Sequence, residues 1–454
     1  MMAVTEAQAT ETRSADMLEG LHRRMRKPAA GWAAQRQRTA FEYFAEHGYP
    51  DLKTEGWRHT SMAAMSSITG APAELQARDI AAVKQSLRRH PLAAMHLPRL
   101  VLLNGRLAPE LSSGGQELAK NGVRTHSLRE AWAGEGLTGL AEQHWARYAG
   151  YQGHALIALN TALTDDGAVI EFTSTDAAQP LLLVHAVSAA AQEQPALHVS
   201  RVLIAAQPSA RVRVIELFIS LTPASYAINA VTEIAAAEDA EVDHYKVGHE
   251  SDLALHFGAV QANLSRHARY RSHAILLGGA RVRNEAICVL DGEGAECLLN
   301  GLYTASGRQH IDNFTRLDHA QPHGTSREFY KGILAGEGVG VFSGRIIVRP
   351  GAQRTDAIQS NRNLLLSPRA ILRAAEPQLE IYADDVRCTH GATVGQLDPE
   401  ALFYLRSRGL DGESARRLLT YAFANEILQQ IQVDELRRLL ESELFARWTG
   451  NGIH

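Results

Sequence analysis

The stretch AICVLDGEGAECLLNGLY, residues 286–303, holds two apolar runs separated by a turn of small and acidic residues. Similar runs recur from ALIALNTAL (155–163) onward, and no helical segment of 10–15 residues alternates with them. Such helices would be needed to connect the parallel strands of a doubly wound α/β fold. The pattern therefore predicts a series of strands that forms a mainly β core over residues 151–395.

A turn followed by a strand repeats within this core. AQPSARVRV (206–214), AEDAEVDHY (237–245), DGEGAECLL (291–299) and RPGAQRTDA (349–357) share an alanine, at positions 210, 240, 295 and 352. The intervals are irregular multiples of a short unit. This spacing fits a sheet that coils in successive rungs, with turns in register and apolar strands stacked inside. A β-sandwich is the alternative that periodicity leaves open.

The region before the core, residues 1–150, is expected to be mostly helical. Residues 33–47 carry apolar side chains at helical spacing, and Gly48 and Pro50 follow as stop signals. The apolar run LPRLVLLNG (97–105) is expected to form a buried strand.

The region after the core, residues 396–454, is also expected to be helical. Asp398 and Pro399 have the residue types favoured at an N-cap and a first helical position. A second helix is expected at about residues 413–432 and a third from Asp434. The sequence thus predicts three regions: helical, β and helical.

Composition narrows the class of protein. The 454 residues are 45% hydrophobic and carry a net charge of −4, which gives no electrostatic argument for binding nucleic acid or an anionic membrane. The N-terminus lacks a signal-like apolar run, no stretch is apolar enough to span a membrane, and cysteines are few. These features predict a cytoplasmic protein. No lysine follows a glycine, so the phosphate-binding G-K-[ST] motif is absent.

Several side chains could take part in metal chemistry. Residues 308–332 contain His310, Asp312, His319 and His323. No zinc-type spacing is met cleanly, which favours polar groups that bond turns and rungs within the core. A self-contained metal site on these residues is the alternative.

The three cysteines lie in two different settings. Cys288 and Cys297 are embedded in apolar runs, as small buried hydrophobic residues usually are. Cys388 and His390 lie two residues apart in ADDVRCTHGATVG (383–395). If the alternation of the preceding strand continues, both point outward and could meet a metal or a partner's ligand, although two ligands do not make a site.

Three blocks of sequence resemble a known family. Residues 354–410, from RTDAIQSN to LRSRGL, resemble the signature of the SufD branch of the SufB/SufD family, from the Suf iron–sulfur cluster assembly system. Residues 48–62 are similar to a second signature of that branch. Residues 310–334 resemble a block shared by SufD and SufB.

The paralogous SufB branch fits less well. SufB typically carries a cysteine where this chain has Thr355-Asp356-Ala357, and His-Glu-Ala near His390 where this chain has Cys-Thr-His-Gly-Ala-Thr. Ile358 departs from the family pattern, which often has histidine there.

The resemblance implies a right-handed parallel β-helix flanked by helices, in a non-catalytic scaffold subunit. Members pair with SufB through the edges of their β-helices and recruit the ATPase SufC through the C-terminal helices. His390 would then contribute to a nascent cluster at the SufB–SufD interface, with Cys388 close by. No cofactor would be intrinsic, and a transient cluster would be shared with the partner. The residues expected to bind SufC are Phe403, Tyr404, Arg406, Arg408, Arg416 and Arg417.

Other functions would give different observations. A SufB-like paralogue would have a cluster-binding role of its own. A β-helix enzyme acting on polysaccharide would need a groove of acids and bases. A self-contained metalloprotein would keep stoichiometric metal when purified alone. The sequence leaves open whether the isolated chain forms a homodimer.

Overall fold

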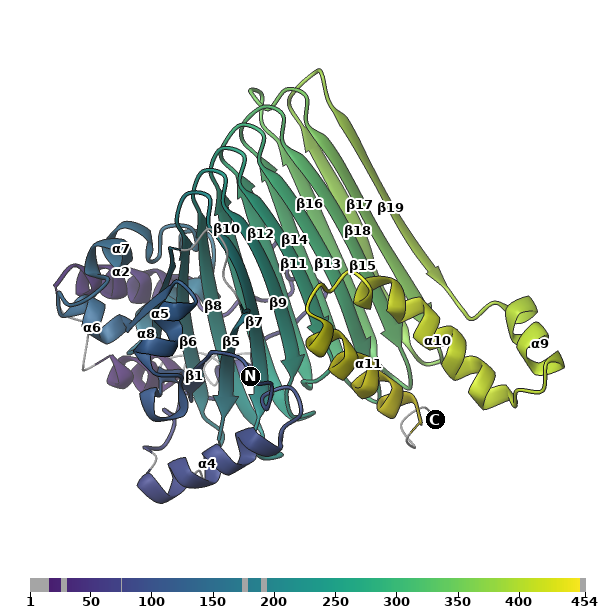
Figure 1. Cartoon of the computed structure of the whole chain (residues 1–454), viewed down its shortest axis with the longest axis horizontal. Helices are drawn as coiled ribbons and strands as arrows, with labels where there is room; N and C mark the ends of the chain where they lie inside the picture. Colours follow the sequence, from purple (N-terminus) through teal and green to yellow (C-terminus); the bar gives the residue numbers. More distant parts are fainter. Residues whose placement is uncertain (1–15, 26–30, 75, 174–178, 189–193, 450–454) are drawn as a thin grey trace, which may run out of the picture.

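Strands that coil in about seven turns form the core of the protein, with helices at both ends (Figure 1). The computed structural model describes residues 16–25, 31–74, 76–173, 179–188 and 194–449, so the polar N-terminal run lies outside the described residues. The prediction of a mainly β fold with a β-helix core and helical flanks is confirmed. Among the described residues, no helix is both long and apolar enough to cross a membrane.

Two sheets face each other across the solenoid, and from β4 onward successive strands alternate between them. The first sheet contains β1 (Arg99–Leu103), β2 (Arg106–Leu107), β5 (Leu181–Val187), β7 (Arg211–Ser220), β9 (Glu241–His249), β11 (Arg269–Leu276), β13 (Glu296–Ala305), β15 (Thr325–Leu334), β17 (Asp356–Leu365) and β19 (Arg387–Gly395). The second contains β3 (Val123–Ser127), β4 (Ala168–Phe172), β6 (Leu197–Ala206), β8 (Tyr226–Ala236), β10 (Ala254–Leu264), β12 (Arg281–Leu290), β14 (His310–His319), β16 (Val339–Val348) and β18 (Ile371–Ile381).

The turns that begin successive rungs share one backbone geometry. A residue with positive φ recurs in them: Ser209, Asp239, His267, Gly294, His323 and Arg354. Ala210, Ala240 and Ala295 each follow such a residue and are buried in the interior apolar cluster. Ala268 and Gly324 occupy the same place in the rungs between, which explains the irregular intervals in the sequence.

The fourth predicted alanine does not hold the repeated position. Ala352 is buried in a longer turn, and Thr355 follows the positive-φ residue Arg354 instead. The rung repeat inferred from these alanines therefore holds for three of the four.

The predicted strand at 155–163 is wrong. These residues form α8 (Ala155–Leu163), which is buried from Leu156 to its end. An apolar run without periodicity does not distinguish a buried strand from a buried helix. His154 caps this helix, because its ring nitrogen accepts from the Ile157 N–H at 3.4 Å.

Helices cover the beginning of the solenoid. They are α2 (Gly31–His47), α3 (Ala63–Ser66), α4 (Ala77–Arg89), the 3₁₀ helix η1 (Pro109–Leu111), α5 (Gly115–Lys120), α6 (Leu128–Trp132), α7 (Thr138–His144) and α8. The expected helix at 33–47 and the expected strand at 97–105 are confirmed by α2 and β1. Gly48 ends α2 with a φ of +65°.

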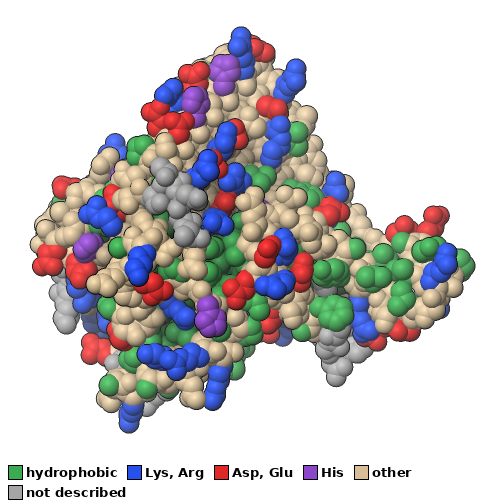
Figure 2. Space-filling view, in the orientation of Figure 1, with side chains coloured by type: hydrophobic (Ala, Val, Ile, Leu, Met, Phe, Trp, Pro, Cys, Tyr) green, Lys and Arg blue, Asp and Glu red, His purple; other side chains and the backbone are tan. Residues whose placement is uncertain are grey.

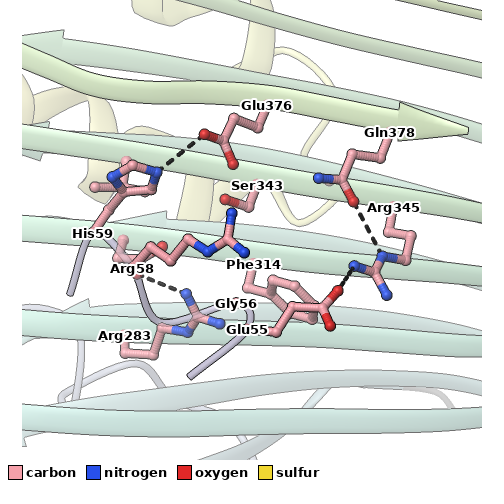
Figure 3. Close-up of a pocket in the computed structure, with 13 residues that line it drawn as sticks. Glu55, Gly56, Arg58, His59, Arg283, Phe314, Ser343, Arg345, Glu376 and Gln378 are labelled. Atoms are coloured by element: carbon pink, nitrogen blue, oxygen red, sulfur yellow. Dashed lines mark hydrogen bonds and ion pairs between the residues drawn. The ribbon is translucent and has the colours of Figure 1, made fainter. Parts of the chain in front are cut away.

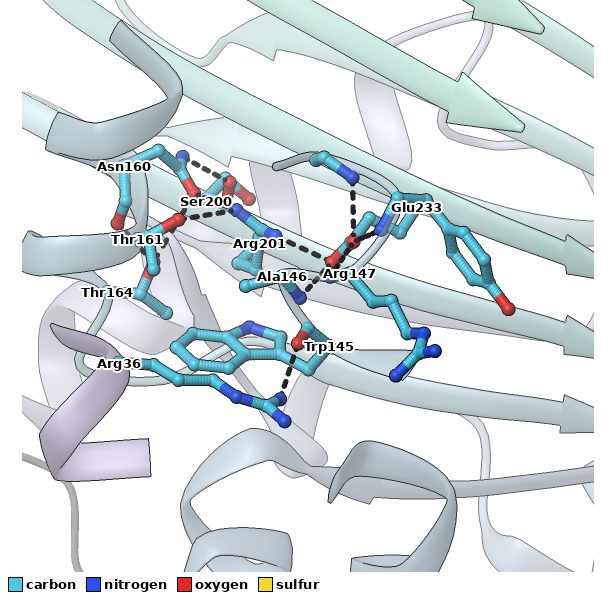
Figure 4. Close-up of polar contacts among 12 residues, drawn as sticks. Arg36, Trp145, Ala146, Arg147, Asn160, Thr161, Thr164, Ser200, Arg201 and Glu233 are labelled. Atoms are coloured by element: carbon cyan, nitrogen blue, oxygen red, sulfur yellow. Dashed lines mark hydrogen bonds and ion pairs between the residues drawn. The ribbon is translucent and has the colours of Figure 1, made fainter. Parts of the chain in front are cut away.

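A fully buried ion pair joins this helical region to the core (Figure 4). Arg201 of β6 lies 2.6 Å from the carboxylate of Glu233 on β8, and it also donates to Asn160 of α8. The Glu233 carboxylate accepts four backbone N–H groups at 2.7–3.0 Å, those of Ala146, Arg147, Tyr148 and Ala149. A buried charge is tolerated only when it is paired and hydrogen-bonded in this way. The loop after α7 is thereby fixed against the second sheet.

Three helices follow the last strand: α9 (Pro399–Ser407), α10 (Gly412–Leu428) and α11 (Asp434–Thr449). The predicted cap is confirmed, since Asp398 accepts from the backbone N–H of Glu400 at 2.9 Å. Lys331 on β15 donates to the Phe423 carbonyl of α10 and pairs with Glu426, both at 2.8 Å. These contacts hold α10 on the outer face of the first sheet.

Candidate functional site

The last rung of the solenoid leaves two strand edges open. β19 pairs with β17, β18 pairs with β16, and no described strand pairs with the other edge of either (Figure 1). An unpaired edge presents a row of backbone donors and acceptors to another chain. The other end of the solenoid carries the N-terminal helices. The open end therefore offers two long edges for strand pairing, whereas the sheets end at the other side in the shorter strands β2 and β3.

Cys388 and His390 both lie on this end, on β19. In strand register, Cys388 adjoins Ala357 and His390 adjoins Gln359 of β17, and these two neighbours are buried in the interior. Residues in register on parallel strands share one face. Cys388 is half-buried and packs against the interior apolar cluster, whereas His390 is exposed.

The prediction that Cys388 and His390 lie together on an outward face of the strand is wrong. β18 ends at Ile381, and the chain turns over residues 382–386 before β19 begins. That turn breaks the two-residue alternation of β18, so its parity does not continue. Cys388 and His390 continue the interior face, and His390 is exposed because no described rung covers it.

The Cys388 thiol is not activated in this setting. Partial burial raises its pKa, against the opposing effect of a hydrogen bond with the Ala357 backbone. Because the thiolate is the nucleophile and the metal ligand, a raised pKa disfavours both roles. Among the described residues, no group of three or more histidine, cysteine and carboxylate side chains is arranged to hold a metal ion.

A buried carboxyl group lies two rungs below this pair. Glu328 of β15 accepts from Thr315 at 2.6 Å and from the Gln359 side-chain amide at 2.7 Å. Burial raises its pKa to about 7. Gln359 lies between Glu328 and His390 in the strand register. The sequence analysis missed Glu328, because a single glutamate within a strand gives no signal without the register.

Apolar side chains surround the open end. Five of them are 40–61% exposed: Ile358, Ile371, Ile381, Tyr382 and Val394. Clusters of exposed apolar residues usually mark surfaces that another protein covers. Their sequence pattern alone would have assigned them to the core.

The helix α9 has no buried residue in the described chain and lies away from the solenoid (Figure 1). Phe403 is 74% exposed and Tyr404 is 57% exposed. The Arg408 guanidinium lies 5.3 Å from the Tyr404 ring centre. Hydrophobic side chains gather over this protrusion, at the right of Figure 2. Four of the six predicted partner-binding residues, at 403, 404, 406 and 408, are thus exposed together near one helix.

The other two predicted residues lie on α10. Arg416 is exposed, whereas Arg417 pairs with Glu413 of its own helix at 2.7 Å and donates to Ser414. Arg417 is thus the weaker candidate for a partner contact, because it is already used within its own helix.

The polar residues of 308–332 have the structural roles that the sequence favoured. His310 and Asp312 both contact Thr60, and Asp312 also pairs with Arg283 at 2.7 Å. His319 is buried against Ser326. His323 lies in a turn at positive φ and is not brought to the others.

The other two cysteines are buried, as expected. Burial raises the pKa of Cys297 far above its ordinary value, and the neighbouring Cys288 adds to this effect. Neither thiol is suited to react with solvent species.

Comparison with known proteins places this fold in a family. Residues 187–423 match the family described as SUF system FeS cluster assembly, SufBD core domain, and residues 10–177 match the SufBD protein N-terminal region. The iron–sulfur cluster assembly protein SufD of Escherichia coli is 32% identical over 89% of this chain and 90% of its own length. An iron–sulfur cluster assembly SufBD family protein of Synechocystis is 31% identical over 86% and 85%.

Proposed function

Because the chain belongs to the SufB/SufD family of iron–sulfur cluster assembly proteins, we propose that it is a non-catalytic scaffold subunit of an assembly complex. In this complex, a SufB-type subunit pairs with the chain and a SufC-type ATPase hydrolyses ATP. The absence of a G-K-[ST] motif from the sequence fits this division of labour. We propose that the complex works in the cytoplasm.

The open end of the solenoid is the proposed surface for the SufB-type subunit. Unpaired backbone groups along β18 and β19 can continue both sheets into a partner that ends in the same way. The exposed apolar residues around this end support the proposal, because pairing would bury them. The same edges allow the isolated chain to pair with a second copy of itself.

His390 is the proposed residue of this chain at the nascent cluster. Its side chain is exposed on the edge strand, where an imidazole nitrogen is free to ligate iron. The cluster is the cargo of the complex, and a cysteine of the SufB-type partner supplies the opposing ligand. Cys388 is a secondary donor, since its thiol must lose a proton that partial burial helps to retain. The exposure of His390 on an unpaired edge is the observation on which the proposal depends.

The C-terminal helices are the proposed docking site of the ATPase subunit. α9 exposes Phe403, Tyr404 and Arg408 on a protrusion away from the core, while α10 is fixed to β15 through Lys331. We propose that ATP-driven dimerisation of two ATPase subunits pulls on these helices. The strain opens the paired edges, so that His390 and Cys388 can receive iron and sulfur.

Co-expression with SufB-type and SufC-type chains tests this function. The expected result is one complex that contains all three chains and accumulates iron, whereas the chain purified alone retains little. Independent migration of the chain in the presence of both partners would overturn the proposal. Stoichiometric iron in the isolated chain would favour a self-contained metalloprotein instead.

A further inference from the structure

The two open edge strands of the last rung differ in how regular they are. β19 pairs with β17 along its nine residues without a shift in register. β18 pairs with β16 across a bulge, because the register shifts between Gly340 and Val341 and leaves Arg373 without a partner. A bulge bends its strand and disrupts the hydrogen-bond ladder. β19 is therefore the more regular of the two edges.

Backbone groups that face the open side alternate along β19. In a parallel sheet the N–H and C=O of one residue point to the same side, and those of the next residue point to the other side. The Arg387 N–H donates to the carbonyl of Thr355, directly before β17, at 2.8 Å. Arg387 and every second residue after it therefore bond on the β17 side. The backbone groups that face the open side are those of Cys388, His390, Ala392 and Val394.

The same alternation brings a proline to the open edge of β18. The N–H of Tyr382, directly after β18, donates to the Val348 carbonyl of β16 at 2.9 Å. After the bulge, even-numbered residues of β18 therefore bond on the β16 side, and odd-numbered residues face the open side. Pro377 is one of these odd-numbered residues. Because proline has no N–H, the open edge of β18 lacks a donor in a row that is complete in β19.

The outer face of β18 is charged and already has partners within the chain (Figure 3). Glu376 of β18 lies 3.0 Å from His59, and Arg345 of the neighbouring strand β16 lies 2.7 Å from Glu55. The segment around His59 therefore lies against the outer face of these strands. Proteins protect edge strands from pairing with prolines, bulges and charged side chains. β18 carries all three.

β19 has little of this protection. The strand contains no proline, and its one arginine, lysine or acidic residue is Arg387 at its first position. Its second half, GATVG (391–395), consists of small and β-branched residues, and all of them are exposed. A regular, exposed edge with few charges is a template to which another chain can add a strand. The chain thus protects β18 from pairing and leaves β19 available.

We propose that the partner adds one strand to β19 and meets β18 through side chains, without a continuous backbone ladder. This assignment rests on the proposed function, in which a SufB-type subunit covers the open end, and it gives the strand pairing to one of the two edges. The backbone of His390 faces the added strand, so the partner residue opposite His390 points to the same face. Directly opposite residues have Cβ atoms about 4.5–5.5 Å apart, which makes that residue the neighbour of the imidazole.

Proline substitutions distinguish the two edges, because each removes an outward N–H and leaves the bonds to the neighbouring strand in place. Ala392→Pro on β19 should weaken binding of a SufB-type chain at least about tenfold, since a carbonyl of the added strand loses its donor. Ala375→Pro is the matched substitution on β18 and should weaken binding by no more than about threefold. Calorimetric titration of the full-length variants measures both affinities, and their unfolding curves check that they fold.

Hydrogen–deuterium exchange of the wild-type chain is a second measurement that needs no variant. Formation of the complex should slow amide exchange strongly in peptides that cover residues 387–395. Peptides that cover residues 375–381 should change much less, because few of their amides gain a hydrogen bond there.

The outcomes separate this assignment from the proposed function. Weaker binding by Ala392→Pro, together with protection concentrated in β19, supports the assignment. Unchanged binding by Ala392→Pro, equal losses for the two variants, or equal protection of β18 and β19 overturns it and leaves the proposed function intact. If the wild-type chain forms no complex with the SufB-type chain, the proposed function and this assignment are both overturned.

Discussion

Cys388 and His390 lie two residues apart on one face of β19, yet Cys388 packs against the solenoid interior while His390 is exposed. The difference arises because Cys388 adjoins the apolar interior at Ala357. His390 lies on the last rung, and no described strand covers it. The two side chains therefore differ in how accessible they are to a partner. From this difference we predict that substituting them has unequal effects.

Cys388→Ser should lower cluster maturation in cells only mildly, and less than His390→Ala does. The raised pKa and partial burial of the thiol limit its use as a ligand. The measurement is the activity of an iron–sulfur enzyme in cells that depend on this system. An effect as severe as that of His390→Ala would make the thiol an essential ligand, and complete neutrality would leave it a packing residue.

Phe403→Asp on α9 should abolish or strongly weaken co-purification of the ATPase subunit. A charge at the centre of an apolar contact must be desolvated without a partner. Leu253→Asp is the control, because Leu253 is also exposed but lies directly before β10, outside the C-terminal helices. Point variants are preferable to deletion after Asp398, since deletion would uncover the apolar surface beneath α10 and α11. Retained binding by Phe403→Asp would place the ATPase contact elsewhere.

Arg201→Ala should lower the free energy of unfolding by about 3–5 kcal/mol, because it leaves the Glu233 carboxylate buried without its cation. Denaturant unfolding followed by circular dichroism measures this change. Arg369→Ala removes an exposed arginine paired with Glu337, and its effect should not exceed about 1 kcal/mol. An equal decrease in the free energy of unfolding for the two variants would show that burial of the ion pair does not determine the size of the decrease.

Glu328 should make the protein less stable as pH rises from about 4.5 to 7. Its folded-state pKa is raised to about 7, so between these values the folded state holds a proton that the unfolded state has lost. Glu328→Gln should therefore be more stable than the wild type above pH 7, by up to about 3 kcal/mol. The difference should vanish below pH 4.5. Unfolding curves over this pH range check the sign, and a difference that grows toward low pH would contradict it.

The sequence predicted those features that repeat or have local signals. Ala210, Ala240 and Ala295 marked true rungs because each follows the tight turn that begins a strand. Asp398 was identified as a helix cap because a capping side chain accepts a hydrogen bond from a backbone N–H only two residues later in the sequence. Residues 155–163 were misassigned because burial on all sides removes the periodicity that distinguishes helix from strand.

The candidate site was predicted in part. The sequence placed Cys388 and His390 on one face, but a turn of five residues separates them from the strand whose parity was extended. Glu328 gave no signal, because its partners Thr315 and Gln359 are distant in sequence. Strand register and tertiary contacts determine which residues meet at such a site. Neither can be inferred from the periodicity of one segment.

The central claim is that His390 acts at the paired edges without holding the complex together. The most direct test is to purify the complex of this chain with its SufB-type and SufC-type partners, as wild type and as His390→Ala. Iron content and cluster absorbance are then compared, with His323→Ala as a control histidine in an exposed turn. We predict unchanged subunit stoichiometry with iron and absorbance largely lost in His390→Ala alone. A His390→Ala complex with the iron content and absorbance of the wild type would contradict the account.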